Sequence, residues 1–195
     1  MKNKIFDRNT IIVLDDVISK TYQNSIEDAV TSNGFIYHFT RDISTDSSSK
    51  VKNFGFSRQL KWNSEENFDP FHYMMIPLLN EAFFRIKKEI SHIFRGRIFM
   101  STSGTPNEID MAHVDDSIYH MVLLYYVNDS TGDTYLFEEF HEENTDIDLI
   151  SPDKLTIKDT VTPKKGRVLI FNGLRYHSSS RPKLNNRIVI NYNLI

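Results

Sequence analysis

A chain of 195 residues, with 39% hydrophobic and 25% charged residues, has the size and composition of one soluble globular domain. Its net charge of −3 gives no overall attraction for nucleic acid, and no basic stripe interleaved with aromatic residues occurs, so nucleic acid is not an expected partner. Cysteine is absent, which excludes disulfides, thiolate metal sites and cysteine nucleophiles. Any metal must therefore be bound by histidine and carboxylate side chains.

No apolar segment is long enough to span a membrane. The apolar run that follows Lys2 and Lys4, residues 11–14, is too short for the core of a signal peptide. Together with the absence of cysteine, these features predict a cytoplasmic protein without membrane contact. The sequence carries no signature of an oligomeric state.

Residues 1–96 combine short strands with two helical patterns. A helix is predicted over residues 17–32, where Asn33-Gly34 is a stop signal. A longer helix is predicted over residues 70–94 and is interpreted as packing on a sheet. Its apolar residues repeat at three- and four-residue steps: Met75, Leu79, Ala82, Phe83, Ile86, Ile90 and Phe94. Strands are predicted over residues 10–14, 35–39 and 54–62.

A polar segment separates the second and third of these strands. Residues 41–52 are rich in serine and aspartate and have almost nothing to bury, which predicts a mobile loop. By composition, this loop and residues 54–62 are candidates for a lid over an active site.

Residues 97–195 contain many short strands separated by turn-rich segments. The predicted strands are residues 97–101, 108–113, 120–127, 134–138, 154–158, 167–171 and 187–193. Such spacing is typical of a sandwich or barrel. We therefore predict a mainly β fold with flanking helices (α+β) in a single domain, residues 1–195. Its core is a double-stranded β-helix, or jelly roll, in residues 97–195, supported by helices and outer strands from residues 1–96.

Three side chains in the C-terminal part have the chemistry of an iron site. His113-Val114-Asp115 places an imidazole and a carboxylate two residues apart, and such residues point to the same side of a strand. His177 follows a predicted turn and strand, residues 166–171, and a short loop. Two histidines and one carboxylate form the ligand set of non-haem Fe(II) oxygenases, which leaves positions open for a 2-oxo acid and dioxygen. The predicted metal ligands and catalytic residues are therefore His113, Asp115 and His177.

Arg187 begins a strongly β-like segment, residues 187–192. A guanidinium buried near a metal needs an anionic partner, and the far carboxylate of 2-oxoglutarate would bind it through two hydrogen bonds. The alternative for Arg187 is a structural ion pair with Asp133 or with a glutamate near residue 138.

These features occur in the order of a known family. Residues 131–137, Thr-Gly-Asp-Thr-Tyr-Leu-Phe, resemble the family's Gly-Gly-x-Thr-x-x-Phe turn. Residues 163–171 resemble its Pro-x-x-Gly-x-x-x-x-Phe approach to the second histidine. With His113-Val114-Asp115 before them and His177 and Arg187 after them, residues 97–193 resemble the prolyl 4-hydroxylase-like branch of the 2-oxoglutarate/Fe(II)-dependent dioxygenase superfamily.

The resemblance implies an enzyme that hydroxylates an unactivated C–H bond with Fe(II), 2-oxoglutarate and O2, releasing succinate and CO2, with ascorbate as an accessory reductant. It implies a prolyl residue of a peptide or protein as the substrate. Hydroxylation of a free amino acid or another small metabolite is the alternative, and a non-catalytic metal-binding jelly-roll module is the alternative of another class. The resemblance also places the Tyr126 hydroxyl at the far carboxylate of 2-oxoglutarate, beside Arg187. Strand alternation then puts Val122 and Leu124 on the same face as Tyr126, and Tyr125 in the core.

Two positions depart from the family pattern. Thr131 replaces the first glycine of the turn, and Val189 stands where many relatives have a serine or threonine that would hydrogen-bond the co-substrate.

Other polar groups near these motifs have simpler interpretations. His120 has odd parity relative to Asp115 on a strand and should face away from the metal. The acidic segment 138–148 is interpreted as a solvated insertion in preference to a calcium loop. Arg175, Tyr176 and Arg181 flank His177 and are candidates for contact with an anionic substrate or for plain loop surface.

Overall fold

The computed structural model describes residues 7–41, 54–62, 68–103 and 109–195. In this part of the chain two antiparallel sheets have the strand orders β1-β8-β5-β10-β4-β3-β2 and β7-β6-β9. The elements in chain order are β1 (Ile11–Leu14), α1 (Lys20–Thr31), β2 (His38–Thr40), β3 (Gly55–Trp62), α2 (Pro70–Arg85), β4 (Ile93–Ser101), β5 (Met121–Tyr126), β6 (Thr134–Phe140), the short 3-10 helix η1 (Pro152–Lys154), β7 (Ile157–Val161), β8 (Val168–Asn172), β9 (Arg175–Ser179) and β10 (Arg187–Leu194).

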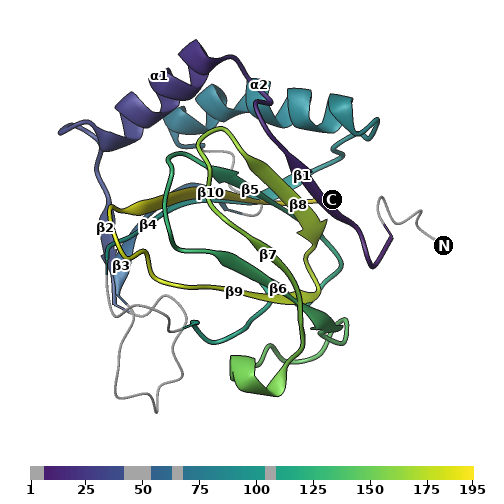
Figure 1. The fold of residues 1–195 in the computed structure, drawn as a ribbon. Coiled ribbons are helices and arrows are strands. Elements are labelled where there is room, and N and C mark those ends of the chain that lie inside the picture. The colour runs from purple at the N-terminus through teal and green to yellow at the C-terminus, as the bar shows by residue number, and fades with distance from the viewer. Residues whose placement is uncertain (1–6, 42–53, 63–67, 104–108) are drawn as a thin grey trace.

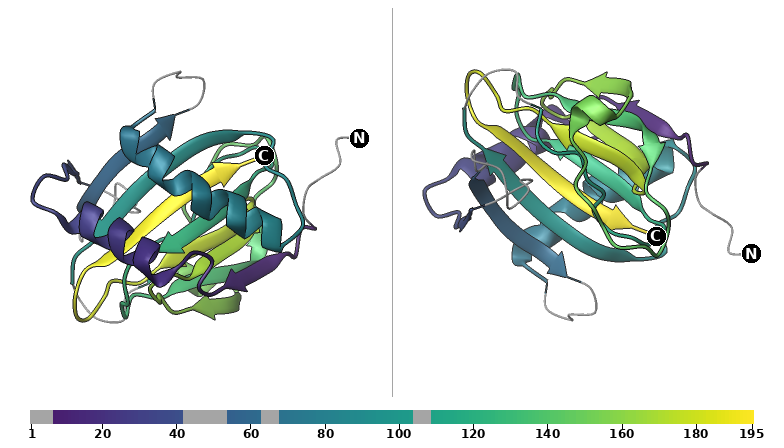
Figure 2. Two further views of the ribbon diagram at one scale, coloured as in Figure 1. Left: turned by 90° about the horizontal axis from the view of Figure 1, so that it is seen from above. Right: turned by 90° about the horizontal axis from the view of Figure 1, so that it is seen from below.

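The elements form three layers. Figure 1 shows both helices on one side of the large sheet and the small sheet on its other side. Seen from above and from below, the helices and the small sheet cover opposite faces of the large sheet (Figure 2). Two facing antiparallel sheets of this kind form a jelly roll, so the predicted mainly β fold with flanking helices is confirmed. In the described part of the chain, neither helix is long and apolar enough to cross a membrane.

Strand alternation gives the large sheet two different faces. On β5, Tyr125 belongs to the core beneath the helices, as predicted, whereas Leu124 and Tyr126 pack toward the small sheet with Leu136 of β6. The same strands therefore build the main hydrophobic core on one face and a second, smaller cluster on the other. The candidate site residues lie on this second face.

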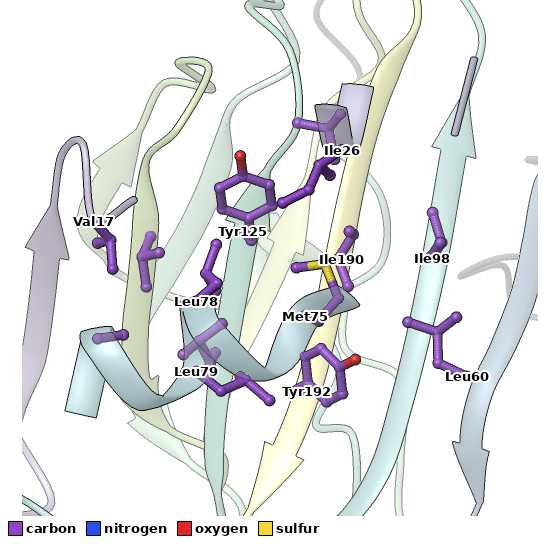
Figure 3. Close-up of a cluster of buried hydrophobic side chains, with 14 of the residues drawn as sticks. Val17, Ile26, Leu60, Met75, Leu78, Leu79, Ile98, Tyr125, Ile190 and Tyr192 are labelled. Atoms are coloured by element: carbon purple, nitrogen blue, oxygen red, sulfur yellow. The ribbon is translucent and has the colours of Figure 1, made fainter. Parts of the chain in front are cut away.

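Helix α2 covers the first face. It begins at Pro70, where the side chain of Asp69 accepts a hydrogen bond from the Phe71 N–H at 2.9 Å and caps the helix. Its buried residues Met75, Leu78 and Leu79 recur at helical spacing and are at most 1% exposed. Figure 3 shows the cluster that they form with side chains of the sheet and of α1, among them Ile26, Leu60, Ile98, Tyr125, Ile190 and Tyr192.

The second helix is shorter than predicted. α2 ends at Arg85 because Lys87 adopts a left-handed conformation, with φ 55°, and the Lys88 N–H donates to the Phe83 carbonyl oxygen at 3.0 Å. Strand β4 starts at Ile93, so the predicted continuation of the helix to Phe94 was wrong. Ile90 still packs against the core from a non-helical segment, which explains why the apolar spacing continues beyond the helix.

Several predicted strands also differ from the structure. Of the predicted strand 35–39, only residues 38 and 39 belong to a strand, β2. Residues 109–113 form isolated bridges, and Glu108 lies outside the described residues. Strand β7 begins at Ile157, after the 3-10 helix, and β9 was predicted as a loop.

Two segments, residues 41–52 and 54–62, were predicted as candidates for a lid. Residues 42–53, which include nearly all of the predicted loop, lie outside the described residues. Residues 54–62 were correctly predicted as a strand, but β3 is hydrogen-bonded between β2 and β4. A strand paired with two neighbours cannot open as a lid without breaking the sheet, so that interpretation of 54–62 was wrong.

Truncation of the α2 core should be costly. Leu78 is 0% exposed, and Leu78→Ala is expected to lower the free energy of unfolding by about 2–5 kcal/mol, through lost burial and the cavity left behind. Phe84 lies on the same helix with 78% exposure, and Phe84→Ala should change the stability by less than about 0.5 kcal/mol. Urea unfolding of both variants measures the difference. Equal losses would contradict the packing described here.

Candidate active site

A backbone bridge joins two histidines that are distant in the sequence. His113 and His177 lie directly opposite each other in an isolated antiparallel bridge, and each N–H donates to the other's carbonyl oxygen at 3.0 Å. Side chains of such opposite residues project to one face, and the two ring centroids are 4.6 Å apart. The bridge therefore sets the spacing of the two imidazoles without any help from a bound ion.

The hydrogen bonds of the two rings select the nitrogen that faces the site. Nδ1 of His113 lies 3.3 Å from the Met111 carbonyl oxygen, and Nδ1 of His177 lies 3.2 Å from the Arg175 carbonyl oxygen. A proton on Nδ1 satisfies each carbonyl and leaves the Nε2 lone pair available. This is the usual arrangement behind a metal-bound histidine.

Asp115 completes the cluster. One ligand atom from each of His113, Asp115 and His177 lies within 4.8 Å of the others, close enough for a single ion. Asn191 donates to Oδ2 of Asp115 at 2.9 Å, Arg97 donates to Oδ1 at 3.2 Å, and Arg95 donates to the backbone carbonyl oxygen at 2.6 Å. Among the described residues no other group of histidines and carboxylates converges in this way, and none does in the acidic segment 138–148.

The surroundings of the cluster give its three side chains the charge states that a metal ligand needs. Burial lowers the pKa of His113 and, together with the neighbouring imidazole, lowers the pKa of His177 to about 4, so both rings are neutral at neutral pH. Burial acts to raise the pKa of Asp115, but nearby positive charge, supplied by His177 when protonated and by Arg95 and Arg97, outweighs it. The pKa of Asp115 is therefore far below its ordinary value, and the group is a carboxylate.

Arg187 is buried without a carboxylate partner among the described residues. Its Nε donates to the Gly132 carbonyl oxygen and its Nη2 to Thr134 Oγ1, both at 2.8 Å. The Tyr126 hydroxyl donates to the same Thr134 oxygen at 2.8 Å. Since Thr134 Oγ1 accepts twice, its own hydrogen remains available as a donor. The predicted alternative, an ion pair with Asp133 or with a glutamate near 138, is not formed.

The turn before β6 brings its backbone against Arg187. A Cβ at Gly132 would lie 2.6 Å from the Ser180 carbonyl oxygen and 3.0 Å from Cδ of Arg187, so a side chain here would displace the turn. Thr131, which departs from the family pattern, accepts a hydrogen bond from the Lys183 N–H at 2.8 Å. Thr131 therefore ties the turn to the segment before β10.

A cavity of about 270 Å³ lies between the two sheets, with the His-Asp-His cluster and Arg187 in its wall. β10 contributes Arg187, Val189 and Asn191 at two-residue steps, as expected for one face of a strand. Val189 gives this part of the wall an apolar surface. Tyr126 is 0% exposed and is not part of the wall; its hydroxyl is separated from the cavity by Thr134.

Sequence reasoning missed several polar residues of the cavity wall, among them Arg95, Arg97, Thr134 and Asn191. The signal for the two arginines was present, since Arg95, Arg97, Phe99 and Ser101 alternate along β4. Arg95 lay outside the predicted strand 97–101, because the helix was predicted to continue to residue 94 and so concealed the start of β4. Arg97 lay within that strand, but a single arginine there gave no sign of a cavity wall.

Other candidate residues do not reach the cavity. His120 is buried in the core and lies outside the metal cluster, as its parity predicted. Arg175 is 0% exposed and donates to the Phe137 carbonyl oxygen. Tyr176 is also buried. Neither Arg175 nor Tyr176 is placed to bind a substrate in the cavity.

Comparison with known proteins gives matches in structure only. No family model matches the sequence, and no curated protein is detectably similar to it. An oxidoreductase of the 2OG-Fe(II) oxygenase family from Burkholderia pseudomallei has a TM-score of 0.64 at 10% identity, over 94% of this chain and 84% of that chain. The epimerase SnoN, in complex with Fe3+, alpha ketoglutarate and nogalamycin RO, has a TM-score of 0.64 at 8% identity, over 96% and 79%. A prolyl hydroxylase from Trichoplax adhaerens, in complex with a hypoxia inducible factor peptide fragment, has a TM-score of 0.56 at 12% identity, over 96% and 84%.

The chain therefore has the fold of the 2-oxoglutarate/Fe(II) oxygenases. This confirms, at the level of the fold, the resemblance that its motifs predicted. Identities this low do not carry substrate or activity from those proteins to this one.

The depressed pKa of His177 predicts a pH dependence of stability in the metal-free protein. Because the folded value is about 4 and the ordinary value is 6.5, the unfolded chain takes up a proton at this residue first as the pH falls. The free energy of unfolding should therefore decrease from about pH 7 to about pH 4, and His177→Gln should flatten that decrease. Urea unfolding in the presence of a chelator measures it, with exposed His38→Gln as the control. An unchanged slope in His177→Gln would contradict the burial of this imidazole.

Proposed function

We propose that this protein is an Fe(II)- and 2-oxoglutarate-dependent dioxygenase that hydroxylates an unactivated C–H bond. The observation that carries the proposal is that His113, Asp115 and His177 converge in the wall of one cavity. The same wall contains Arg187, which is buried and has no carboxylate partner among the described residues. A structural zinc site would need a fourth protein ligand, and this cluster offers three. The remaining positions on an ion are left for exogenous ligands.

The residues fit Fe(II) and the co-substrate on the chemistry of their donor atoms. Two neutral imidazoles and a carboxylate are the ligand set of non-haem iron oxygenases. The guanidinium of Arg187, with the spare hydrogen of Thr134 beside it, offers donors that match a carboxylate. When bound, Fe(II) and 2-oxoglutarate supply the oxidation that inserts one oxygen atom of O2 into a C–H bond, with succinate and CO2 as the other products.

The protein itself contributes position and charge. The backbone bridge fixes the two imidazoles, and Asn191 and Arg95 fix the carboxylate and the backbone of Asp115. Arg187 orients the co-substrate from the far side of the cavity. The apolar side chains of Val189 and Leu124 restrict the water that can enter between these groups.

A prolyl residue of a peptide or protein is our proposed substrate. The cavity volume of about 270 Å³ lies below the usual range for pockets that enclose a whole ligand, roughly 300–1,000 Å³. A space of this size suits the co-substrate and one inserted side chain. A free amino acid or small metabolite is the alternative. Mass spectrometry for the gain of one oxygen atom, with succinate release and with ascorbate present, separates the two substrate classes. The absence of succinate release with either class would support a non-catalytic module.

The metal site can be tested by absorption spectroscopy. Anaerobic addition of Fe(II) and 2-oxoglutarate is expected to give a weak visible charge-transfer band, because the 2-oxo acid would bind directly to the metal. His113→Ala and Asp115→Ala should abolish this band together with iron binding, whereas exposed His38→Ala should keep both. A wild-type protein with neither the band nor bound iron would refute the proposed function.

Arg187 can be tested separately from the metal. Arg187→Ala should weaken 2-oxoglutarate binding by about 30- to 150-fold, since a paired charge-assisted contact contributes about 2–3 kcal/mol, and it should leave iron affinity unchanged. Tyr126→Phe should weaken binding only about threefold, because its hydroxyl acts through Thr134. Titration of the visible band measures both constants. Normal 2-oxoglutarate affinity in Arg187→Ala would place the co-substrate elsewhere.

A further inference from the structure

The cavity carries more positive charge than the proposed metal and co-substrate use. Among the described residues of its wall, three guanidinium groups, those of Arg95, Arg97 and Arg187, face a single carboxylate, that of Asp115. An Fe(II) dication and a 2-oxoglutarate dianion add no net charge. A loaded site would therefore keep an excess of positive charge, and charges in a low-dielectric cavity need counter-charges.

Strand register places two of these arginines at opposite ends of the cavity. Arg187 on β10 is paired with Ser101 on β4, whereas Arg97 is paired with Asn191. Four residues along a strand separate the two positions by about 13 Å. The cluster of His113, Asp115 and His177 is next to the Arg97 end, through the contact between Asp115 and Arg97.

Arg95 and Arg97 differ in their contacts with Asp115 and in the exposure of their side chains. Arg95 donates to the Asp115 backbone at 2.6 Å, its side chain is 10% exposed, and it acts as a positioning residue. Arg97 makes one contact of 3.2 Å to Oδ1 of Asp115, and its guanidinium lies 4.7 Å from the centre of the Phe99 ring. Nε of Arg97, like that of Arg95, is buried and has no partner among the described residues, but the side chain of Arg97 is more exposed, at 26%. Most donors of Arg97 therefore remain available at the edge of the cavity.

A metal ion on Asp115 would increase the need of Arg97 for another anion. The ion would share the carboxylate that now faces the guanidinium, and it would add positive charge within a few ångströms. The far carboxylate of 2-oxoglutarate is accounted for by Arg187. Arg97 can be reached from solvent, because it is partly exposed and lies next to Gln59, which is paired with it across β3 and β4 and is exposed.

We propose that Arg97 binds an anionic group of the primary substrate, a carboxylate or a phosphate, at the mouth of the cavity. This inference rests on the proposed function and adds a substrate class to it: an acidic molecule, or an acidic side chain or terminus near the residue that is hydroxylated. The anion is held on the Asp115 side of the metal, and the C–H bond reaches in from there.

The test uses inorganic phosphate as the probe. The whole protein, loaded anaerobically with Mn(II) and saturating 2-oxoglutarate, is titrated with phosphate by calorimetry. Arg97→Ala should weaken phosphate binding by about tenfold or more, and Arg97→Lys, which keeps the charge but loses the planar fork, by about threefold. Lys183→Ala removes one exposed positive charge outside the cavity and should leave phosphate binding unchanged. The affinity for 2-oxoglutarate should stay within about twofold of wild type in all three variants, and Lys183→Ala should also keep the affinity for Mn(II).

The outcomes separate the two proposals. Phosphate binding that does not depend on Arg97, with normal 2-oxoglutarate binding, overturns the anion site and leaves the proposed function standing. A loss of 2-oxoglutarate affinity in Arg97→Ala as large as that in Arg187→Ala also overturns it, because Arg97 would then belong to the co-substrate site. Phosphate binding that depends on Arg97 in a protein that binds no 2-oxoglutarate supports the anion site and refutes the proposed function.

Discussion

The backbone bridge between His113 and His177 is the contact on which the candidate site depends. Two reciprocal hydrogen bonds of 3.0 Å hold the two chain segments in register, and the geometry of an antiparallel pair then directs both imidazoles to one side. A shift of one residue in this pairing would turn one ring away from the other. Asp115, two residues beyond the bridge, is held at the same point by hydrogen bonds from Asn191 and Arg95, with a longer contact to Arg97.

The strands of the large sheet contribute to the hydrophobic core on one face and to the candidate site on the other. On β10, Ile188, Ile190 and Tyr192 pack beneath the helices, and the alternate residues Arg187, Val189 and Asn191 line the cavity. Packing of the helices on the first face therefore fixes the position of the polar groups on the second face. This coupling accounts for two polar or charged side chains, Arg187 and Asn191, that face the cavity from a strand buried along its whole length.

The sequence was most informative where residues able to bind a metal or an anion occur together with turn motifs in a fixed order along the chain. Two histidines, an aspartate and an arginine at ordered intervals, together with turn motifs, predicted a fold that the structure confirms, and the structure brings these residues to one cavity. Strand parity correctly placed Tyr125 in the core. Contacts made through backbone pairing were not predictable, since the bridge at His113 has no side-chain pattern and β9 lacks strand alternation that could be recognised. Arg95 of β4 was missed because the apolar spacing of α2 continues past its end through Ile90, which concealed the start of the strand.

The central claim is that one ion is bound by these three side chains and that Arg187 holds the co-substrate opposite to it. Anomalous diffraction from crystals grown anaerobically with Mn(II) and 2-oxoglutarate tests it most directly. We expect one anomalous peak about 2.0–2.3 Å from Nε2 of His113, Nε2 of His177 and a carboxylate oxygen of Asp115, with the far carboxylate of 2-oxoglutarate on Arg187. A metal bound at another set of residues, or 2-oxoglutarate bound away from Arg187, would contradict the account.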